Sequence, residues 1–300
     1  MVQKQLTQQL KKGQIKIKDL AIPLIEPGQV LVRNHYSLIS VGTEASTIKA
    51  AQKNLIGKAR SRPHQAKQVL EVLRTQGPVA TYRAVMKKLD AYSPLGYSSA
   101  GEVLEVGEGV RSVRPGDLVA CGGSSANHAE IISVPENLTA LLPVNADLKL
   151  AAYNSLGAIA MQGIRRAELG LGETCAVIGL GLIGQLTGLM LAASGVRTFG
   201  IDLDKKAVEV GNRLGFDVTS LRNSPGIDDT IAEFSNGIGF DAVIIAAGTN
   251  SLDPINFAGA IARKCGKVIV VGNVPTGFDR DPHYYRKELD LRMSCSYGPG

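Results

Sequence analysis

Residues 175–204 read CAVIGLGLIGQLTGLMLAASGVRTFGIDLD, and this stretch decides the fold of the second half of a 300-residue chain. Gly179, Gly181 and Gly184 stand in G-x-G-x-x-G spacing. A lone motif of this kind is a weak signal, but this one follows a β-rich strand, opens a helix and precedes a second strand that ends in Asp202. The context therefore predicts a strand–turn–helix–strand unit whose turn receives a ligand.

The glycine spacing predicts a turn that binds the pyrophosphate of a dinucleotide. Gly179 permits the tight turn, Gly181 lets the backbone approach the pyrophosphate, and Gly184 lets the helix pack on the strand. The free N–H groups at the helix start, which include Leu182 and Ile183, and the helix dipole then hold the phosphates.

The end of the second strand indicates which dinucleotide is bound. Asp202 lies 18 residues beyond Gly184, where a carboxylate accepts hydrogen bonds from ribose hydroxyls and repels a 2′-phosphate. Leu203 follows at the same strand end, and Lys205 and Lys206 come soon after it. We therefore expect NAD as the cofactor, in preference to NADP.

Apolar strands alternate with helical patterns from about residue 149 to the end, which predicts a Rossmann fold with a doubly wound parallel sheet. Ligands of such sheets lie at the carboxyl ends of the strands. Two later strand ends are therefore expected at the cofactor; they carry Ala247, Gly248, Gly272 and Asn273. Ordinary strand-to-helix turns are the alternative for these four residues.

The first half has a different pattern. Residues 1–40 and the stretch after residue 90 predict short strands, and the glycines and prolines between them are typical of a compact barrel. Residues 47–90 instead show helical spacing, with Gly77-Pro78 separating two helices. We expect a barrel domain over 1–148 with a helical insert at about 47–90, and a Rossmann domain over 149–300.

The helical insert is strongly basic. Ten Lys and Arg residues lie between Ala45 and Tyr92, against only Glu71 and Asp90. A solvated helix face and a contact surface for an acidic partner both fit this charge, because charge alone does not name a partner.

Composition and targeting signals restrict the protein class. The 44% hydrophobic and 20% charged residues are ordinary for a globular chain, and the absence of Trp argues against stacking on single-stranded nucleic acid. The polar start and the lack of long apolar runs predict neither a signal peptide nor a membrane span, hence a cytoplasmic setting. The four cysteines form no C-x-x-C pair, and Cys175 and Cys265 are expected to be buried thiols.

Two segments of the first half show a family resemblance. Residues 95–120, LGYSSAGEVLEVGEGVRSVRPGDLVA, resemble the GHE-x-x-G-x-V segment of the medium-chain dehydrogenase/reductase superfamily, the zinc alcohol dehydrogenase-like proteins. Residues 37–44, SLISVGTE, resemble the loop that carries the first catalytic zinc ligand in that superfamily. The resemblance covers nearly the whole chain and implies a GroES-like β-barrel catalytic domain beside the Rossmann domain.

The zinc ligands of the superfamily are missing. Val41 stands where the family has Cys, Tyr97 where it has the His of GHE, and Ala158 or a neighbour where a third ligand falls. Val and Ala cannot ligate Zn²⁺, and Tyr rarely does. We therefore expect no metal.

Other features resemble a narrower branch. The loop S-x-I-S-x-GTE, the basic insert and the ending CSYGPG look like a zinc-lacking branch found at the front of bi-domain oxidoreductases, where a Gfo/Idh/MocA-type module follows. That branch is associated with surface polysaccharide and nucleotide-sugar metabolism. The chain ends where the superfamily returns to complete its catalytic domain, so we expect a fragment, a truncated relative or a module completed by another chain.

Without zinc, other groups must polarise the substrate or move its proton. Thr43 stands where the family has the hydroxyl that relays the substrate proton, and Glu44 is beside it. Ser46 stands where a relay His often stands. The phenol of Tyr97 is expected to face the cleft. Turn chemistry for Thr43 and Glu44, and a plug in the empty metal site for Tyr97, are the alternatives. His128 is expected at a strand edge on the surface.

These residues predict a zinc-independent, NAD-dependent oxidoreductase that transfers a hydride to or from a hydroxyl or carbonyl carbon, on a sugar or nucleotide-sugar substrate. A non-catalytic NAD-binding module that docks to a fused or partner dehydrogenase is one alternative, and a quinone or enoyl reductase is another. The expected partner is a small-molecule substrate, with no nucleic acid and no membrane. A homo-oligomer stays open.

Overall fold

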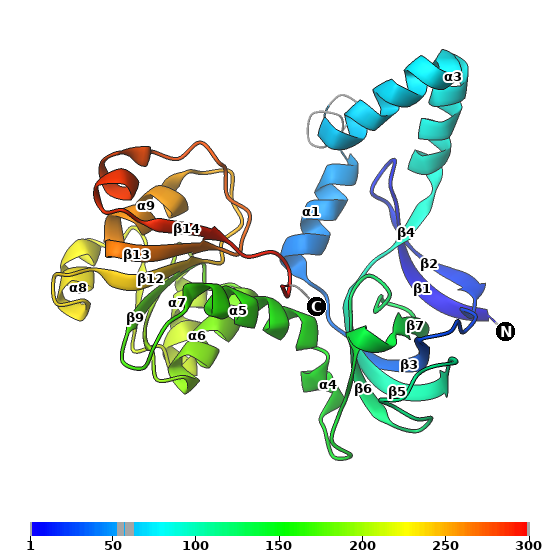
Figure 1. The fold of residues 1–300 in the computed structure, drawn as a ribbon, viewed down its shortest axis with the longest axis horizontal. Coiled ribbons are helices and arrows are strands. Elements are labelled where there is room, and N and C mark those ends of the chain that lie inside the picture. The colour runs from blue at the N-terminus through cyan, green and yellow to red at the C-terminus, as the bar shows by residue number, and fades with distance from the viewer. Residues whose placement is uncertain (1, 53–56, 58–62, 299–300) are drawn as a thin grey trace. The chain divides into compact units, whose positions relative to one another are not determined.

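The structure, a computed structural model, describes residues 2–52, 57 and 63–298. The chain divides into two compact units, residues 1–155 and 156–300. Each unit has its own sheets (Figure 1). Each unit also has its own core of buried side chains.

The second unit contains a six-stranded parallel sheet with the strand order β11-β10-β9-β12-β13-β14. Its chain order alternates strands and helices, as the apolar pattern predicts. The strands are β9 (Thr174–Ile178), β10 (Arg197–Asp202), β11 (Val218–Leu221), β12 (Phe240–Ile245), β13 (Ala262–Val270) and β14 (Asp290–Met293). The helices are α5 (Asn154–Ala167), α6 (Leu182–Ala193), α7 (Lys205–Leu214), α8 (Ile227–Phe234) and α9 (Asp253–Ile261), followed by the short helix η2 (Arg280–Tyr284).

Alternate side chains of the central strands enter two different cores. In β9, Ala176 and Ile178 pack with residues of α8 and α9, whereas Cys175 and Val177 pack with residues of α5, α6 and α7. Because successive side chains of a strand point to opposite faces, both faces of this sheet are covered by helices. The central strands β9 and β12 are therefore buried on both faces, which explains their almost continuous runs of apolar residues.

The first unit contains two antiparallel sheets. A five-stranded sheet has the order β7-β3-β5-β6-β8 and a three-stranded sheet the order β2-β1-β4. The strands are β1 (Val2–Gln9), β2 (Ile15–Ala21), β3 (Gln29–Ser37), β4 (Tyr92–Pro94), β5 (Ser98–Val106), β6 (Leu118–Gly122), β7 (Ile131–Pro135) and β8 (Thr139–Leu141), with a short helix η1 (Glu136–Leu138) before β8. This GroES-like half-barrel and the Rossmann sheet confirm the predicted fold class.

The predicted insert is helical, and the helical region begins earlier than expected. Helix α1 (Val41–Gln52) includes the end of the SLISVGTE segment, and α3 (Pro63–Asp90) follows. Gly77 breaks α3 with φ 78°, which is the predicted separation into two helices, and Figure 1 shows its two parts meeting at an angle. Four basic residues of the insert, Lys53, Lys58, Arg60 and Arg62, lie outside the described residues.

Two further features differ from what the sequence pattern suggests. The helical stretch ADLKLAAYNSLGAIAMQGIRRAEL, residues 146–169, forms two helices, α4 (Leu148–Ala151) and α5. The Asn154 amide at the break donates to the carbonyl oxygens of Ala151 and Ser99, at 3.1 and 3.0 Å. Cys265 is exposed, not buried, because it lies with φ 56° in an irregular part of β13, where the pairing with β12 jumps from Ala262 to Lys267. Within residues 2–52, 57 and 63–298, no helix combines the length and apolarity needed to cross a membrane.

Candidate functional site

The glycine-rich turn between β9 and α6 has a geometry that demands glycine at two of its three positions. Gly179 adopts φ 96°, and a Cβ there would lie 2.6 Å from the Ala247 backbone nitrogen. A Cβ on Gly184 would lie within 3.0 Å of two Gly179 backbone atoms, the carbonyl oxygen and its carbon. Both glycines therefore allow backbone segments to pack closely, as the motif predicts.

Gly181 is different, because nothing within 4 Å would meet a Cβ built on it. It is the N-cap of α6, with φ −67° and ψ −172°, and it provides no side-chain cap. The first N–H groups of a helix have no intrahelical partner, so those of Leu182, Ile183 and Gly184 remain available to an anion. An open glycine beside uncapped N–H groups fits a pyrophosphate, and this chain thus offers a suitable cradle for a dinucleotide.

Asp202 lies at the carboxyl end of β10, next to this turn. Its Oδ2 accepts the Leu180 N–H at 2.6 Å and its Oδ1 accepts the Asp204 N–H at 2.9 Å. These two bonds fix the carboxylate, and each oxygen keeps a second lone pair for a ribose hydroxyl. Leu203, the next residue, is 73% exposed, so its side chain is free to cover a bound ring.

The other predicted strand ends meet the glycine turn. Ala247 follows β12, and its N–H donates to the Ile178 carbonyl oxygen at 3.1 Å. A Cβ on Gly272, after β13, would be within 3.0 Å of three Ala246 and Ala247 backbone atoms. The Asn273 carbonyl oxygen accepts the Thr249 N–H at 2.9 Å, so the loop that contains Gly248 lies beside the loop that contains Gly272. The structure thus brings all three loops together at one edge of the sheet.

The catalytic residues predicted in the first unit do not form one group. Thr43, Glu44 and Ser46 lie on α1 and not on a loop. The side chains of Thr43 and Ser46 are exposed, whereas Glu44 is buried on another side of the helix. Only Glu44 of these three therefore has a structured polar environment.

The residues at the positions of the superfamily's zinc ligands do not form a group of side chains that could bind a metal. Val41 begins α1 and is 76% exposed, and Tyr97 is half-buried, with its backbone oxygen accepting the Ser155 hydroxyl at 2.9 Å. Ala158 lies on α5 in the second unit. Across the described part of the chain, no group of three or more His, Cys, Asp or Glu side chains could hold a metal ion.

His128 is the residue that the sequence missed. Its Nδ1 lies 2.8 Å from the Ser37 Oγ, and its Nε2 lies 3.1 Å from the Glu44 Oε2. The side chains of His128 and Glu44 are only 8% and 9% exposed, so the expectation of a surface histidine was wrong. No local pattern could reveal this, because Ser37 and Glu44 are 91 and 84 residues away in sequence.

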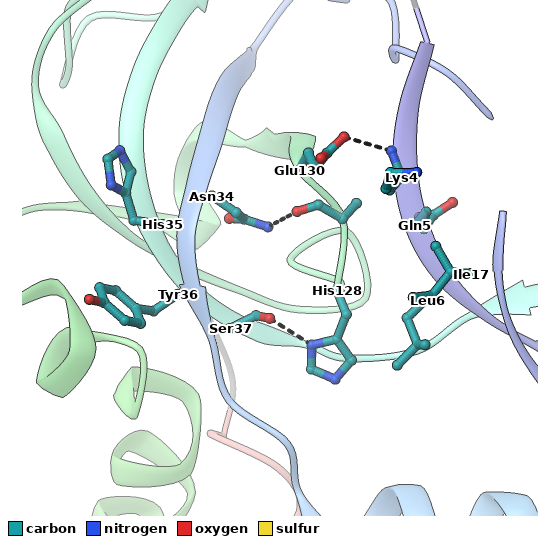
Figure 2. A pocket seen from close by; sticks show the side chains of 11 residues that line it. Lys4, Gln5, Leu6, Ile17, Asn34, His35, Tyr36, Ser37, His128 and Glu130 are labelled. Carbon is teal, nitrogen blue, oxygen red and sulfur yellow. Dashed lines mark hydrogen bonds between the residues drawn. The ribbon is translucent and has the colours of Figure 1, made fainter. Parts of the chain in front are cut away.

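Ser37 and His128 also line a surface pocket of about 330 Å³ in the first unit. Figure 2 shows the His128 imidazole directed at Ser37, with Lys4, Gln5 and Leu6 of β1 on the other side of the pocket. The Ser37 hydroxyl is therefore exposed to a ligand, while the rest of the hydrogen-bonded chain is buried.

Comparison with known proteins agrees with this architecture. The family model described as zinc-binding dehydrogenase matches residues 183–300. (R,R)-butanediol dehydrogenase from Bacillus subtilis (strain 168) is 26% identical over 170 residues, which are 48% of this chain and 48% of the relative. D-guloside 3-dehydrogenase from Escherichia coli (strain K12) is 24% identical over 211 residues, 67% of this chain and 59% of the relative.

Solved structures match over more of the chain. A crystal structure of 2R,3R-butanediol dehydrogenase from Bacillus subtilis has a TM-score of 0.75 at 20% identity, covering 98% of this chain and 84% of that one. A putative zinc-binding dehydrogenase from Sinorhizobium meliloti 1021, bound to NADP, has a TM-score of 0.70 at 18% identity with the same coverage. At these identities the structures show the fold alone.

The chain thus matches the zinc-binding dehydrogenase family model over residues 183–300, and it is similar to zinc-type alcohol dehydrogenase-like proteins in sequence and in fold. These findings agree with the resemblance to the medium-chain dehydrogenase/reductase superfamily seen in the sequence. The match spans about half to three fifths of the length of the curated relatives. The comparisons support neither the zinc-lacking branch nor a following Gfo/Idh/MocA-type module, and both stay predictions.

Proposed function

We propose that this protein is an NAD(H)-dependent oxidoreductase that transfers a hydride between the nicotinamide and a hydroxyl or carbonyl carbon of a polyol or sugar-type substrate. The observation that carries the proposal is the turn at Gly179–Gly184, whose open Gly181 and uncapped helix start suit a pyrophosphate. Bound NAD would supply the hydride chemistry, and the chain's own residues bind, orient and exchange protons.

The preference for NAD rests on Asp202. Its carboxylate is held by two backbone N–H groups at the end of β10, so it cannot easily turn away from a ribose 2′-phosphate. The Sinorhizobium relative binds NADP, so the superfamily fold alone does not decide between the two cofactors. Repulsion between two negative charges at this fixed position favours NAD.

The substrate class rests on the relatives and on the pocket. One relative is named for a butanediol and the other for a guloside, which are both hydroxyl-rich molecules. Ser37, Asn34 and Gln5 give the pocket of the first unit hydroxyl and amide groups suited to such ligands.

We further propose that the enzyme works without a catalytic zinc, although the matching family is described as zinc-binding. The support is the side chains of Val41 and Ala158, which have no donor atoms, and Tyr97, which rarely binds Zn²⁺. Elemental analysis after dialysis tests this point, and one zinc per chain that survives dialysis would refute it.

The test of the function has two stages. Fluorescence titration should show tighter binding of NADH than of NADPH, and equal or tighter NADPH binding would overturn the cofactor assignment. Purified protein is then assayed with NAD⁺ on diols, polyols and sugars, and with NADH on the matching carbonyls.

Tight NADH binding without any turnover would instead favour a non-catalytic module that docks to a partner dehydrogenase. NADPH-dependent reduction of quinones or enoyl compounds would favour that reductase class.

A further inference from the structure

Three polar side chains from separate parts of the first unit form a continuous hydrogen-bonded chain. Ser37 ends β3, Glu44 lies in the first turn of α1, and His128 precedes β7. We propose that Ser37, His128 and Glu44 are the proton relay of the enzyme, with the Ser37 Oγ as the atom that receives the proton of the substrate hydroxyl. This inference rests on the proposed oxidoreductase function and replaces the roles predicted for Thr43 and Ser46.

The arrangement of acceptors decides which imidazole nitrogen carries the hydrogen. The Glu44 Oε1 accepts the Ser40 N–H at 2.8 Å, and its Oε2 faces the Nε2 of His128 at 3.1 Å. A carboxylate can only accept hydrogen bonds, so the hydrogen of a neutral ring lies on Nε2. The Nδ1 is then an acceptor, and the hydroxyl of Ser37 must donate to it across 2.8 Å. His128 is therefore oriented as a base toward Ser37.

The ring is held in place on more than one side. Gly96 has φ 95°, and a Cβ on it would lie 2.8 Å from the His128 Nδ1 and Cε1, so the imidazole packs directly on this backbone. Gly96 directly precedes Tyr97, which stands at a zinc-ligand position of the superfamily, and Glu44 belongs to the other segment of that resemblance. His128 thus contacts both segments that carry the family likeness.

The surroundings leave Glu44 as the charged group in contact with His128. The other titratable groups that line the pocket are Lys4, His35, Tyr36 and Glu130. Of these, Lys4 pairs with Asp19 at 3.5 Å, His35 faces Glu102 at 4.0 Å, and the Glu130 carboxylate accepts the Lys4 backbone N–H at 2.7 Å. Their partners lie outside the relay, so Glu44 is the group that stabilises a protonated His128 ring.

The proton balance of alcohol oxidation follows from this geometry. When the cofactor is bound, it would take up the hydride of the substrate carbon. The O–H bond of the substrate breaks as its proton passes to the Ser37 Oγ. The Ser37 O–H proton moves to the His128 Nδ1, which leaves Ser37 neutral and the imidazolium paired with Glu44. The proton then returns through Ser37 to solvent, and carbonyl reduction uses the same path in reverse.

Glu44→Gln is the sharpest variant, because it keeps the side-chain shape and exchanges an acceptor for a donor. The Gln oxygen can still accept the Ser40 N–H, while its amide donates toward Nε2 and forces the hydrogen onto Nδ1. The Ser37 proton then has no acceptor. General-base contributions are typically 10²–10⁴-fold, so kcat for alcohol oxidation at pH 7 should fall by about 100-fold with the KM for NAD⁺ unchanged.

His128→Gln should give a similar loss in kcat, with a pH profile that lacks the limb due to the histidine. Glu102→Gln is the matched control, because it removes a carboxylate beside another histidine of the same sheet, and its kcat and pH profile should equal those of the native protein. Native kcat and an unchanged pH profile in both Glu44→Gln and His128→Gln, in an enzyme that turns over alcohols, would overturn the relay and leave the oxidoreductase function standing.

A second readout needs no turnover. Nitrogen NMR of the His128 ring in the native protein should show the hydrogen on Nε2 at a pH where the ring is neutral, and on Nδ1 in Glu44→Gln. Hydrogen on Nδ1 in the native protein would overturn the relay whatever the activity. Absence of turnover on every substrate would overturn the proposed function, while the tautomer still shows whether the ring is oriented toward Ser37.

Discussion

Replacing Gly181 and Gly184 separately by Ala should separate cofactor binding from folding. A methyl group on Gly181 meets no atom within 4 Å, and its φ of −67° is open to any residue. The weaker N-cap preference of Ala costs about 0.5–1 kcal/mol, and the reduced freedom of the unfolded chain offsets about 0.4–1 kcal/mol. We therefore expect Gly181→Ala to unfold at nearly the native temperature.

The same methyl group should obstruct the cofactor. It occupies the open side of the turn through which a pyrophosphate would approach the N–H groups of α6. Loss of one or two such charge-assisted bonds is worth about 1–3 kcal/mol, and every 1.4 kcal/mol is tenfold in affinity. NADH affinity should fall by roughly 10- to 100-fold.

Gly184→Ala should behave in the opposite way. Its Cβ would lie within 3.0 Å of the Gly179 carbonyl group, which belongs to a turn fixed by β9 and cannot move aside easily. Overpacking of this kind costs about 1–3 kcal/mol, which lowers the unfolding temperature of a unit of this size by roughly 2–12 °C. Gly277→Ala, another glycine with open space around it, is the control for a neutral methyl group.

Thermal unfolding and NADH fluorescence titration of the three variants decide the matter. Native NADH affinity in a stable Gly181→Ala protein would refute the assignment of this turn to the pyrophosphate. Native stability of Gly184→Ala would refute the packing argument, and weakened NADH binding in Gly277→Ala would show that the assay is not specific for the turn.

Three further predictions concern single side chains. Asp202→Asn should weaken NADH binding by about 1–3 kcal/mol and narrow the preference over NADPH, and titration with both cofactors would contradict this if the preference stayed the same. Burial opposes ionisation of Asp241, but the Thr174 N–H and hydroxyl and the Arg263 guanidinium outweigh it and hold the pKa of that carboxyl below its usual value. The stability that Asp241 contributes is therefore present above the unfolded pKa of about 4, and it is lost as the pH falls through the folded pKa. Asp241→Asn should lower the free energy of unfolding in urea by about 1–3 kcal/mol at pH 7 and by less in acid. A difference in stability between the two proteins that stays constant with pH would contradict this prediction. Burial raises the pKa of the Cys121 thiol to about 12, so iodoacetamide should label the exposed Cys265 and Cys295 of the folded protein first, and equally fast labelling of Cys121 would contradict its burial.

The amino-acid sequence by itself determined the second unit and the meeting of its loops at the carboxyl ends of the strands, where we propose that the cofactor binds. The reason is that each part of that prediction is local or periodic: the glycine spacing fixes the turn, the apolar runs fix strands buried on both faces, and strand ends of a parallel sheet meet at one edge. Gly179, Ala247 and Gly272 accordingly lie together in the structure. The GroES-like half-barrel was predicted from the 95–120 segment, whose likeness to the superfamily is carried by glycines and alternating apolar residues.

Tertiary structure alone decided the polar group in the first unit. The sequence placed Thr43, Glu44 and Ser46 together because they are neighbours in the chain, but α1 begins at Val41 and turns their side chains to different sides. What brings Glu44 and Ser37 to His128 is the packing of α1 and β3 against the segment before β7, over separations of 84 and 91 residues. A hydrogen bond across such a distance in sequence leaves no spacing to detect, because it depends on sheet pairing and helix placement and not on local pattern.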